Sequence, residues 1–180
     1  MDGNLVEPCD FPINPAGFNI HAGLLSALPE TNSVMHLHTR DGVAVSALKE
    51  GLLPLSQHSL RVYGMLTYHD YEGIALELDE RPRLARDLGP TSKAMILRNH
   101  GLLALGETVA EAFQVMYYLD TSCQIQIDAL SCGRMEPELM SEAVAEKGTT
   151  QFIQCAAEDG KKEWPALLRM LDRRGIDYRI

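Results

Sequence analysis

Short apolar runs alternate along this chain with stretches of helical periodicity, and no other feature constrains its fold as strongly. The apolar runs predict strands at residues 33–39, 52–55, 60–63, 93–99 and 102–105. The periodic stretches predict helices at residues 20–28, 43–49, 79–88, 108–130, 136–146 and 164–173, and a polar stretch predicts a turn at 68–73. Because alternating strands and helices pack in layers, the sequence predicts an α/β domain in which helices cover a sheet.

The clearest single element is the long helix that begins after Thr108. Thr108 is followed three residues later by Glu111, a capping-box pair, and apolar residues then recur at helical spacing as far as Leu130. With 180 residues, the chain is long enough for one domain with a sizeable core and short for two. We therefore expect a single domain over residues 1–180.

The charge balance and the cysteines narrow the class of protein. Lys and Arg number 16 against 25 Asp and Glu, a formal net charge of −9, which repels phosphate backbones and anionic lipids. No apolar run approaches the roughly 20 residues that span a bilayer, and the start of the chain lacks a secretory signal pattern. We therefore expect a cytoplasmic protein with no nucleic acid or membrane partner. Four cysteines without a CxxC pair predict buried, reduced thiols: Cys9, Cys123, Cys132 and Cys155.

All six histidines lie in the first 100 residues, and three of them suggest a metal site. His36 and His38 are two residues apart on a predicted strand, so their side chains project from the same face. His100 ends another predicted strand and precedes Gly101, where the absence of a side chain lets another group approach closely. Three imidazoles with an open coordination position suit Zn²⁺ best and accept other divalent first-row metals.

The same histidines also have a structural interpretation. Two histidines at strand spacing are compatible with half-buried side chains that donate hydrogen bonds to carbonyl groups. A histidine before a glycine at the end of a strand is compatible with an ordinary turn. The spacing alone leaves both interpretations open.

Three segments together resemble the class II aldolase/adducin head domain family: residues 12–21, 34–48 and 97–106. The resemblance extends from about residue 10 to residue 130, and more loosely to residues 164–168. It implies a three-layer α/β/α sandwich around a central, largely antiparallel sheet, assembled as a homotetramer with clefts near the subunit interfaces. In enzymes of this family zinc is held by histidines that correspond to His36, His38 and His100. There the metal binds the hydroxyl and carbonyl oxygens of a sugar phosphate and stabilises an enediolate while a carbon–carbon bond breaks or forms.

The chain departs from the aldolases of this family in two ways. Their acid/base glutamate corresponds to a position near Gly17, and glycine cannot move a proton. Their phosphate-binding N-terminal portion has no counterpart here, so we expect the single domain to lack it. His58 lies close to the position of a catalytic tyrosine in some aldolases, which makes it the candidate catalytic acid; a solvent-facing loop histidine is the alternative.

Two hypotheses about function follow. The first is a divalent-metal-binding aldehyde-lyase that acts on a small hydroxy-carbonyl or sugar-phosphate substrate. The second is a non-catalytic, adducin-like interaction or scaffold domain with an actin or other cytoskeletal partner. The complete set of three histidines favours the first hypothesis. Gly17, together with the residue patterns at 14–18, 68–73 and 98–100, favours the adducin-like branch.

Overall fold

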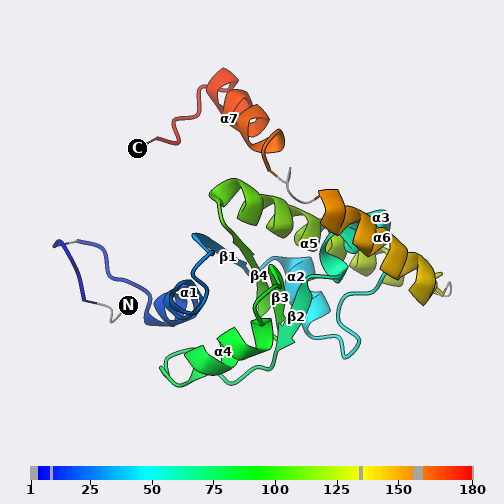
Figure 1. Cartoon of the computed structure of the whole chain (residues 1–180), viewed down its shortest axis with the longest axis horizontal. Coiled ribbons are helices and arrows are strands. Elements are labelled where there is room, and N and C mark those ends of the chain that lie inside the picture. Colours follow the sequence, from blue (N-terminus) through cyan, green and yellow to red (C-terminus); the bar gives the residue numbers. More distant parts are fainter. Residues whose placement is uncertain (1–3, 9, 134–135, 156–159, 180) are drawn as a thin grey trace.

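The computed structural model describes residues 4–8, 10–133, 136–155 and 160–179, and Figure 1 shows how the elements are arranged. The helices among these residues are α1 (Pro15–Ala27), α2 (Arg40–Ser46), α3 (Gln57–Tyr63), α4 (Glu80–Leu88), α5 (Val109–Leu130), α6 (Glu142–Cys155) and α7 (Glu163–Arg173). The strands are β1 (Ser33–Leu37), β2 (Leu66–His69), β3 (Ala94–Leu97) and β4 (Gly101–Gly106). Strands and helices alternate along the chain, which confirms the predicted α/β class.

The strands form one sheet in the order β1-β4-β3-β2. Strand β4 pairs antiparallel with both β1 and β3, whereas β2 pairs parallel with β3. The sheet is therefore mixed, with antiparallel pairing across β1, β4 and β3. Every residue of the central strands β3 and β4 is buried, which explains why their sequences are continuously apolar rather than alternating.

Helices cover both faces of this sheet, which confirms the three-layer α/β/α arrangement. Helices α1 and α4 pack on one face, against side chains that include Met95, Leu103 and Leu105. Helices α2, α3 and α5 lie on the other face, against Ile96 and Leu102. Neighbouring residues of one strand therefore contribute to opposite halves of the core, as the pleat of a strand requires. Figure 1 shows α1 and α4 on one side of the sheet and α5 on the other.

The predicted strands at 52–55 and 60–63 are wrong. The second lies within helix α3, which begins after Ser56, whose side chain accepts a hydrogen bond from the backbone N–H of Ser59 in a capping box. Residues 52–55 pair with no strand in the part of the chain that the structure describes. Instead, the backbone N–H of Leu52 donates to the hydroxyl of Tyr68, and that of Leu53 donates to Oε1 of Gln126. Side chains from other elements thus accept the backbone hydrogen bonds of this apolar segment. A pattern of hydrophobic residues cannot reveal such contacts.

Other elements are shifted from their predicted positions. Strand β2 occupies Leu66–His69, so part of the turn predicted at 68–73 is a strand, and α6 begins at Glu142 and extends to Cys155. Cys123 is buried as expected, but Cys132, which follows the end of α5, and Cys155, the last residue of α6, are exposed. Cys9 lies outside the described residues. None of the described helices has the length and apolar character needed to cross a membrane.

Gln126 provides a test of how the segment after α2 is held. Its side chain accepts from Leu53 at 2.7 Å, donates to the carbonyl of Gly51 at 2.8 Å, and is 1% exposed. Gln126→Leu should lower the free energy of unfolding by about 2–4 kcal/mol, because two buried backbone groups lose their partner. Urea denaturation measures this change. The matched variant Gln124→Leu, on the exposed side of α5, should change stability by less than about 0.5 kcal/mol; equal losses would contradict the role of Gln126.

Candidate metal centre

The pairing of β1 with β4 places the three histidines at one end of the sheet. His36 lies on β1 opposite Leu103, and Leu37, the last residue of β1, lies opposite Leu102. His38 directly follows β1, and His100 directly precedes β4. Because the two strands are antiparallel, the end of β1 meets the beginning of β4. Histidines that are 64 residues apart in sequence are therefore neighbours in space.

The imidazole nitrogens of these histidines converge. Nε2 of His36 lies 2.8 Å from Nε2 of His38 and 3.3 Å from Nε2 of His100. The ring centroids of the three pairs are 4.5, 4.8 and 4.7 Å apart. One nitrogen from each of the three rings lies within 4.8 Å of the others. The structure brings together the three residues that the sequence nominated as ligands.

Burial favours the neutral forms of His36 and His100, and hydrogen bonding fixes the tautomer of His36. Nδ1 of His36 lies 2.9 Å from the carbonyl oxygen of Leu102, so it carries the proton and leaves a lone pair on Nε2. Burial lowers the pKa of His36 to about 4; the bond to Leu102 opposes this shift, and the nearby His100 and His38 reinforce it. Burial also lowers the pKa of His100. Neutral imidazoles whose lone pairs meet at one point fit a divalent first-row metal ion.

Gly101 allows the close approach of the two strand ends. A Cβ atom at this position would lie 2.5 Å from the carbonyl oxygen of Leu37 and 2.9 Å from Cδ2 of His38. The first neighbour is backbone and cannot rotate away. The interpretation of Gly101 as a point of close approach is therefore correct.

The three histidines line one side of a cavity of about 360 Å³. The beginning of α1, the loop after β2 and the turn between β3 and β4 supply the rest of its lining: Asn14, Ala16, Gly17, Ile20, Tyr71, Gly73, Ile74, Ala75 and Asn99. A Cβ atom at Gly17 would meet only the side chain of Asn14, at 3.9 Å. Position 17 is thus open to the cavity and carries no side chain.

His58, the candidate catalytic acid, is not brought to this cavity. It is exposed on α3, with its ring centroid 5.8 Å from that of Tyr118 on α5, and it is not among the residues that line the cavity. A role for His58 in this cavity would require a second copy of the chain. His21 lies on α1, where burial lowers its pKa.

Two features near the cavity are not evident from the sequence. Tyr71 lies on its rim, with its ring edge-on to that of His100 at a centroid distance of 6.2 Å. The charged turn residues on either side of it, Asp70 and Glu72, are the only local signal of this position. His69 is buried and bonds to Asp87 at 2.7 Å, a pairing across 18 residues that no local pattern indicates.

Comparisons with known proteins agree with this architecture. Residues 1–127 match the family model of the Class II Aldolase and Adducin N-terminal domain. A putative aldolase class 2 protein of Caulobacter vibrioides is 47% identical over 178 residues, which cover 99% of this chain and 69% of that protein. Human beta-adducin is 39% identical over 184 residues, which cover 94% of this chain and 25% of the adducin.

Two solved structures are similar over most of the chain. An aldolase II superfamily protein from Pseudomonas syringae superposes with a TM-score of 0.88 at 46% identity, over 99% of this chain and 72% of that one. An L-fuculose 1-phosphate aldolase from Glaciozyma antarctica superposes with a TM-score of 0.63 at 27% identity, over 82% of this chain and 62% of that one.

The contact at Gly101 predicts a cost for the smallest possible side chain. Gly101→Ala should lower the free energy of unfolding by about 1–3 kcal/mol, because its Cβ atom would overlap the carbonyl oxygen of Leu37. Gly17→Ala is the matched control, since α1 has space there, and it should be neutral or stabilising by up to about 1 kcal/mol. Thermal and urea unfolding compare the two variants; a Gly101→Ala protein as stable as the wild type would mean that the strand ends lie further apart.

The lowered pKa of His36 predicts how the stability of the metal-free protein depends on pH. Unfolded His36 takes up a proton near its ordinary pKa of 6.5, whereas the folded side chain does so only near pH 4. Its contribution to stability should therefore be present above pH 6.5 and be lost as the pH falls toward 4. Urea denaturation with a chelator present, between pH 7 and 4, should show a shallower decline for His36→Gln than for the wild type. Parallel curves would argue against a buried, neutral His36.

Proposed function

The chain belongs to the Class II Aldolase and Adducin N-terminal domain family, and from this we propose that it is a divalent-metal-dependent aldehyde-lyase. Its substrate would be a small hydroxy-carbonyl compound or sugar phosphate in which a carbon–carbon bond breaks or forms. The observation that carries the proposal is the convergence of three imidazole nitrogens at the wall of a cavity. The similarity to an L-fuculose 1-phosphate aldolase supports the same reaction class.

The proposal gives the three histidines one shared role, that of metal ligands. His36, His38 and His100 hold the ion, zinc or another divalent first-row metal, and the carbonyl of Leu102 fixes the tautomer of His36. A metal bound there acts as a Lewis acid, which offsets negative charge that develops on a substrate oxygen. The cavity beside the histidines holds the substrate and orients its oxygens toward them.

Proton transfer requires a group other than residue 17. We assign His58 as the proton-transfer residue of a neighbouring copy, because its exposed position on α3 is available to a second chain. The proposed active form is therefore a homo-oligomer, a tetramer by the resemblance to the family, that acts in the cytoplasm.

Two observations favour a second function. Gly17 offers no acid/base side chain to the cavity that it lines, and the chain is 39% identical to human beta-adducin over 184 residues. The alternative is thus a non-catalytic interaction domain of the adducin type with an actin or other cytoskeletal partner. Such a domain has no requirement for three convergent imidazoles.

Metal content tests the centre directly. The wild-type protein, incubated with zinc and then desalted, should retain about one equivalent of metal by mass spectrometry. His36→Ala and His100→Ala should each reduce the retained metal at least about tenfold, because each removes one of three ligands. His58→Ala is the control and should retain the wild-type content. Metal that is sub-stoichiometric, and unchanged by either ligand substitution, would overturn the proposed centre.

Turnover separates the two functions. The zinc-loaded protein should cleave at least one member of a panel of short hydroxy-carbonyl compounds and sugar phosphates, and a chelator should abolish this cleavage. Full metal occupancy without cleavage of any compound would favour the interaction domain.

A further inference from the structure

The loop between β2 and α4, residues 70–79, forms one wall of the cavity and carries Tyr71 at its rim. The tyrosine ring lies edge-on to His100, and its side chain is 53% exposed. The hydroxyl makes no hydrogen bond with any of the residues that the structure describes. A donor is therefore available beside the three histidines.

Apolar packing does little to fix this loop. Three of its large apolar side chains are mostly exposed: Ile74 at 71%, Leu76 at 55% and Leu78 at 64%. Because they bury little surface, hydrophobic contacts alone leave the position of Tyr71 weakly determined.

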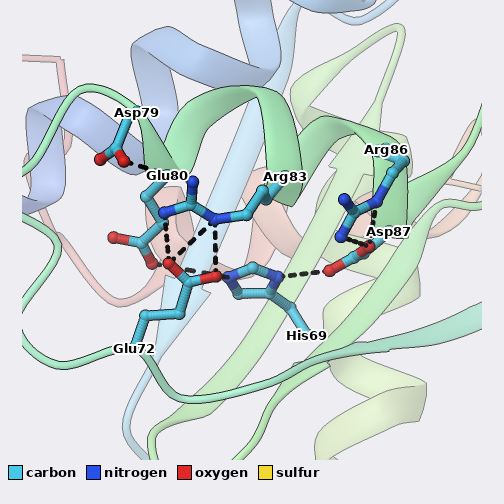
Figure 2. A network of polar contacts seen from close by, with 7 residues as sticks. All are labelled: His69, Glu72, Asp79, Glu80, Arg83, Arg86 and Asp87. Carbon is cyan, nitrogen blue, oxygen red and sulfur yellow. Dashed lines mark hydrogen bonds and ion pairs between the residues drawn. The ribbon is translucent and has the colours of Figure 1, made fainter.

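Polar contacts made by residues on both sides of Tyr71 fix the position of the loop. Two residues before it, Nδ1 of His69 bonds to Oδ2 of Asp87 at 2.7 Å, and His69 is only 4% exposed. One residue after it, both carboxylate oxygens of Glu72 accept from Nε of Arg83, at 2.8 and 3.0 Å. Asp87 and Arg83 both lie on α4, and Figure 2 shows the two pairs side by side. We call these two pairs the loop clamp.

The loop clamp persists at neutral pH because its carboxylates stay ionised. The hydrogen bonds from Arg83 lower the pKa of Glu72. Burial raises the pKa of Asp87, but its hydrogen bonds to His69 and Arg86 outweigh this and the net shift is downward.

A third contact ties the far side of the loop to α1. Nδ2 of Asn19, a residue 7% exposed, donates to the carbonyl oxygen of Ala75 at 2.9 Å. Oδ1 of the same side chain accepts from Arg81 on α4 at 2.7 Å. The loop is thus held between α1 and α4, the two helices on this face of the sheet.

The other polar side chains at the cavity are less suited to meet a substrate. Besides the three histidines and Tyr71, only Asn14 and Asn99 have polar side chains among the described residues of the lining. Oδ1 of Asn14 accepts from the N–H of Ala16 as the cap of α1. Asn99 occupies a tight turn with a φ of 56°, next to His100. Tyr71 is the side chain that a dedicated set of contacts presents to the cavity.

We propose that Tyr71 contacts the substrate, its hydroxyl donating a hydrogen bond to a substrate oxygen, and that the loop clamp positions it. This inference rests on the proposed function. It assigns substrate recognition to a residue of the same chain that holds the metal, whereas His58 acts from a second copy.

Binding of a small chelating probe tests the role of Tyr71. The full chain, loaded with zinc, is titrated calorimetrically with glycolohydroxamate, which presents two adjacent oxygens and a hydroxyl group. Tyr71→Phe should weaken binding about 3- to 10-fold, the range for one net hydrogen bond, and leave the zinc content unchanged. Tyr63→Phe, on α3 and outside the cavity lining, is the matched control and should bind the probe as the wild type does.

A double-variant cycle tests the loop clamp. Arg83→Met removes the contact with Glu72, and because Arg83 is at the surface this variant should fold. It should weaken probe binding by a similar factor, while Arg173→Met on the exposed face of α7 should not. Since the loop clamp acts through Tyr71, combining Arg83→Met with Tyr71→Phe should add little to the loss from Tyr71→Phe alone.

The possible results separate this inference from the proposed function. Undiminished probe binding by zinc-loaded Tyr71→Phe would overturn the role of Tyr71 and leave the metal centre intact. Independent, multiplying losses in the double variant would overturn positioning by the loop clamp. A wild-type protein that retains no zinc, or that binds no probe when loaded, would overturn the proposed function and this inference with it.

Discussion

The antiparallel pairing of β1 with β4 is the contact on which the site depends. It places the residue after one strand beside the residue before the other, so two short stretches of chain supply three imidazoles to one point. The pairing buries every residue of β4, whose side chains pack alternately into the two halves of the core. The absence of a side chain at Gly101 then allows the strand ends to approach closely enough for His38 and His100 to meet. The hydrophobic core and the convergence of the three histidines thus share one structural determinant.

Much of this arrangement could be predicted from the sequence because it is encoded locally. Two histidines at strand spacing, and a third before a glycine, are visible in the residues themselves, and so are the periodic helices on either side of the sheet. What could not be predicted depends on contacts between distant residues. The segment at 52–55 is apolar like a strand, yet its backbone is satisfied by Tyr68 and Gln126. The pair of His69 with Asp87 likewise spans two elements, and only the folded chain shows that it supports the wall of the cavity.

The location of the cavity explains how one fold serves two kinds of protein. His36 lies on the sheet and His38 and His100 lie at the ends of its strands, whereas the remaining lining comes from the beginning of α1, the loop before α4 and the turn between β3 and β4. Gly17 is a lining position at which a side chain could be added without disturbing the core, since nothing packs closely against it. A glycine at this position is compatible with a metal site, with an acid/base group elsewhere, or with a role in binding alone. A shared sheet that carries the histidines, combined with lining segments that can vary, is consistent with the similarity of this chain to both putative aldolases and adducins.

The hydrogen bonding and burial of the three histidines bear on whether this site holds a metal or serves in binding alone. The Nδ1 proton of His36 is directed to the carbonyl oxygen of Leu102, so Nε2 of His36 carries a lone pair. This atom lies 2.8 Å from Nε2 of His38. The lone pair must therefore face either a proton on His38 or a cation. Burial at the same time disfavours the protonated form of His36 and holds its pKa near 4. The cluster brings together one nitrogen from each of three imidazoles, of which His36 and His100 are partly buried and His38 is exposed, and a protein that uses its surface only to bind a partner has no need of this convergence. A divalent ion would be coordinated by all three nitrogens at once, and for this reason the geometry suits the proposed metal centre.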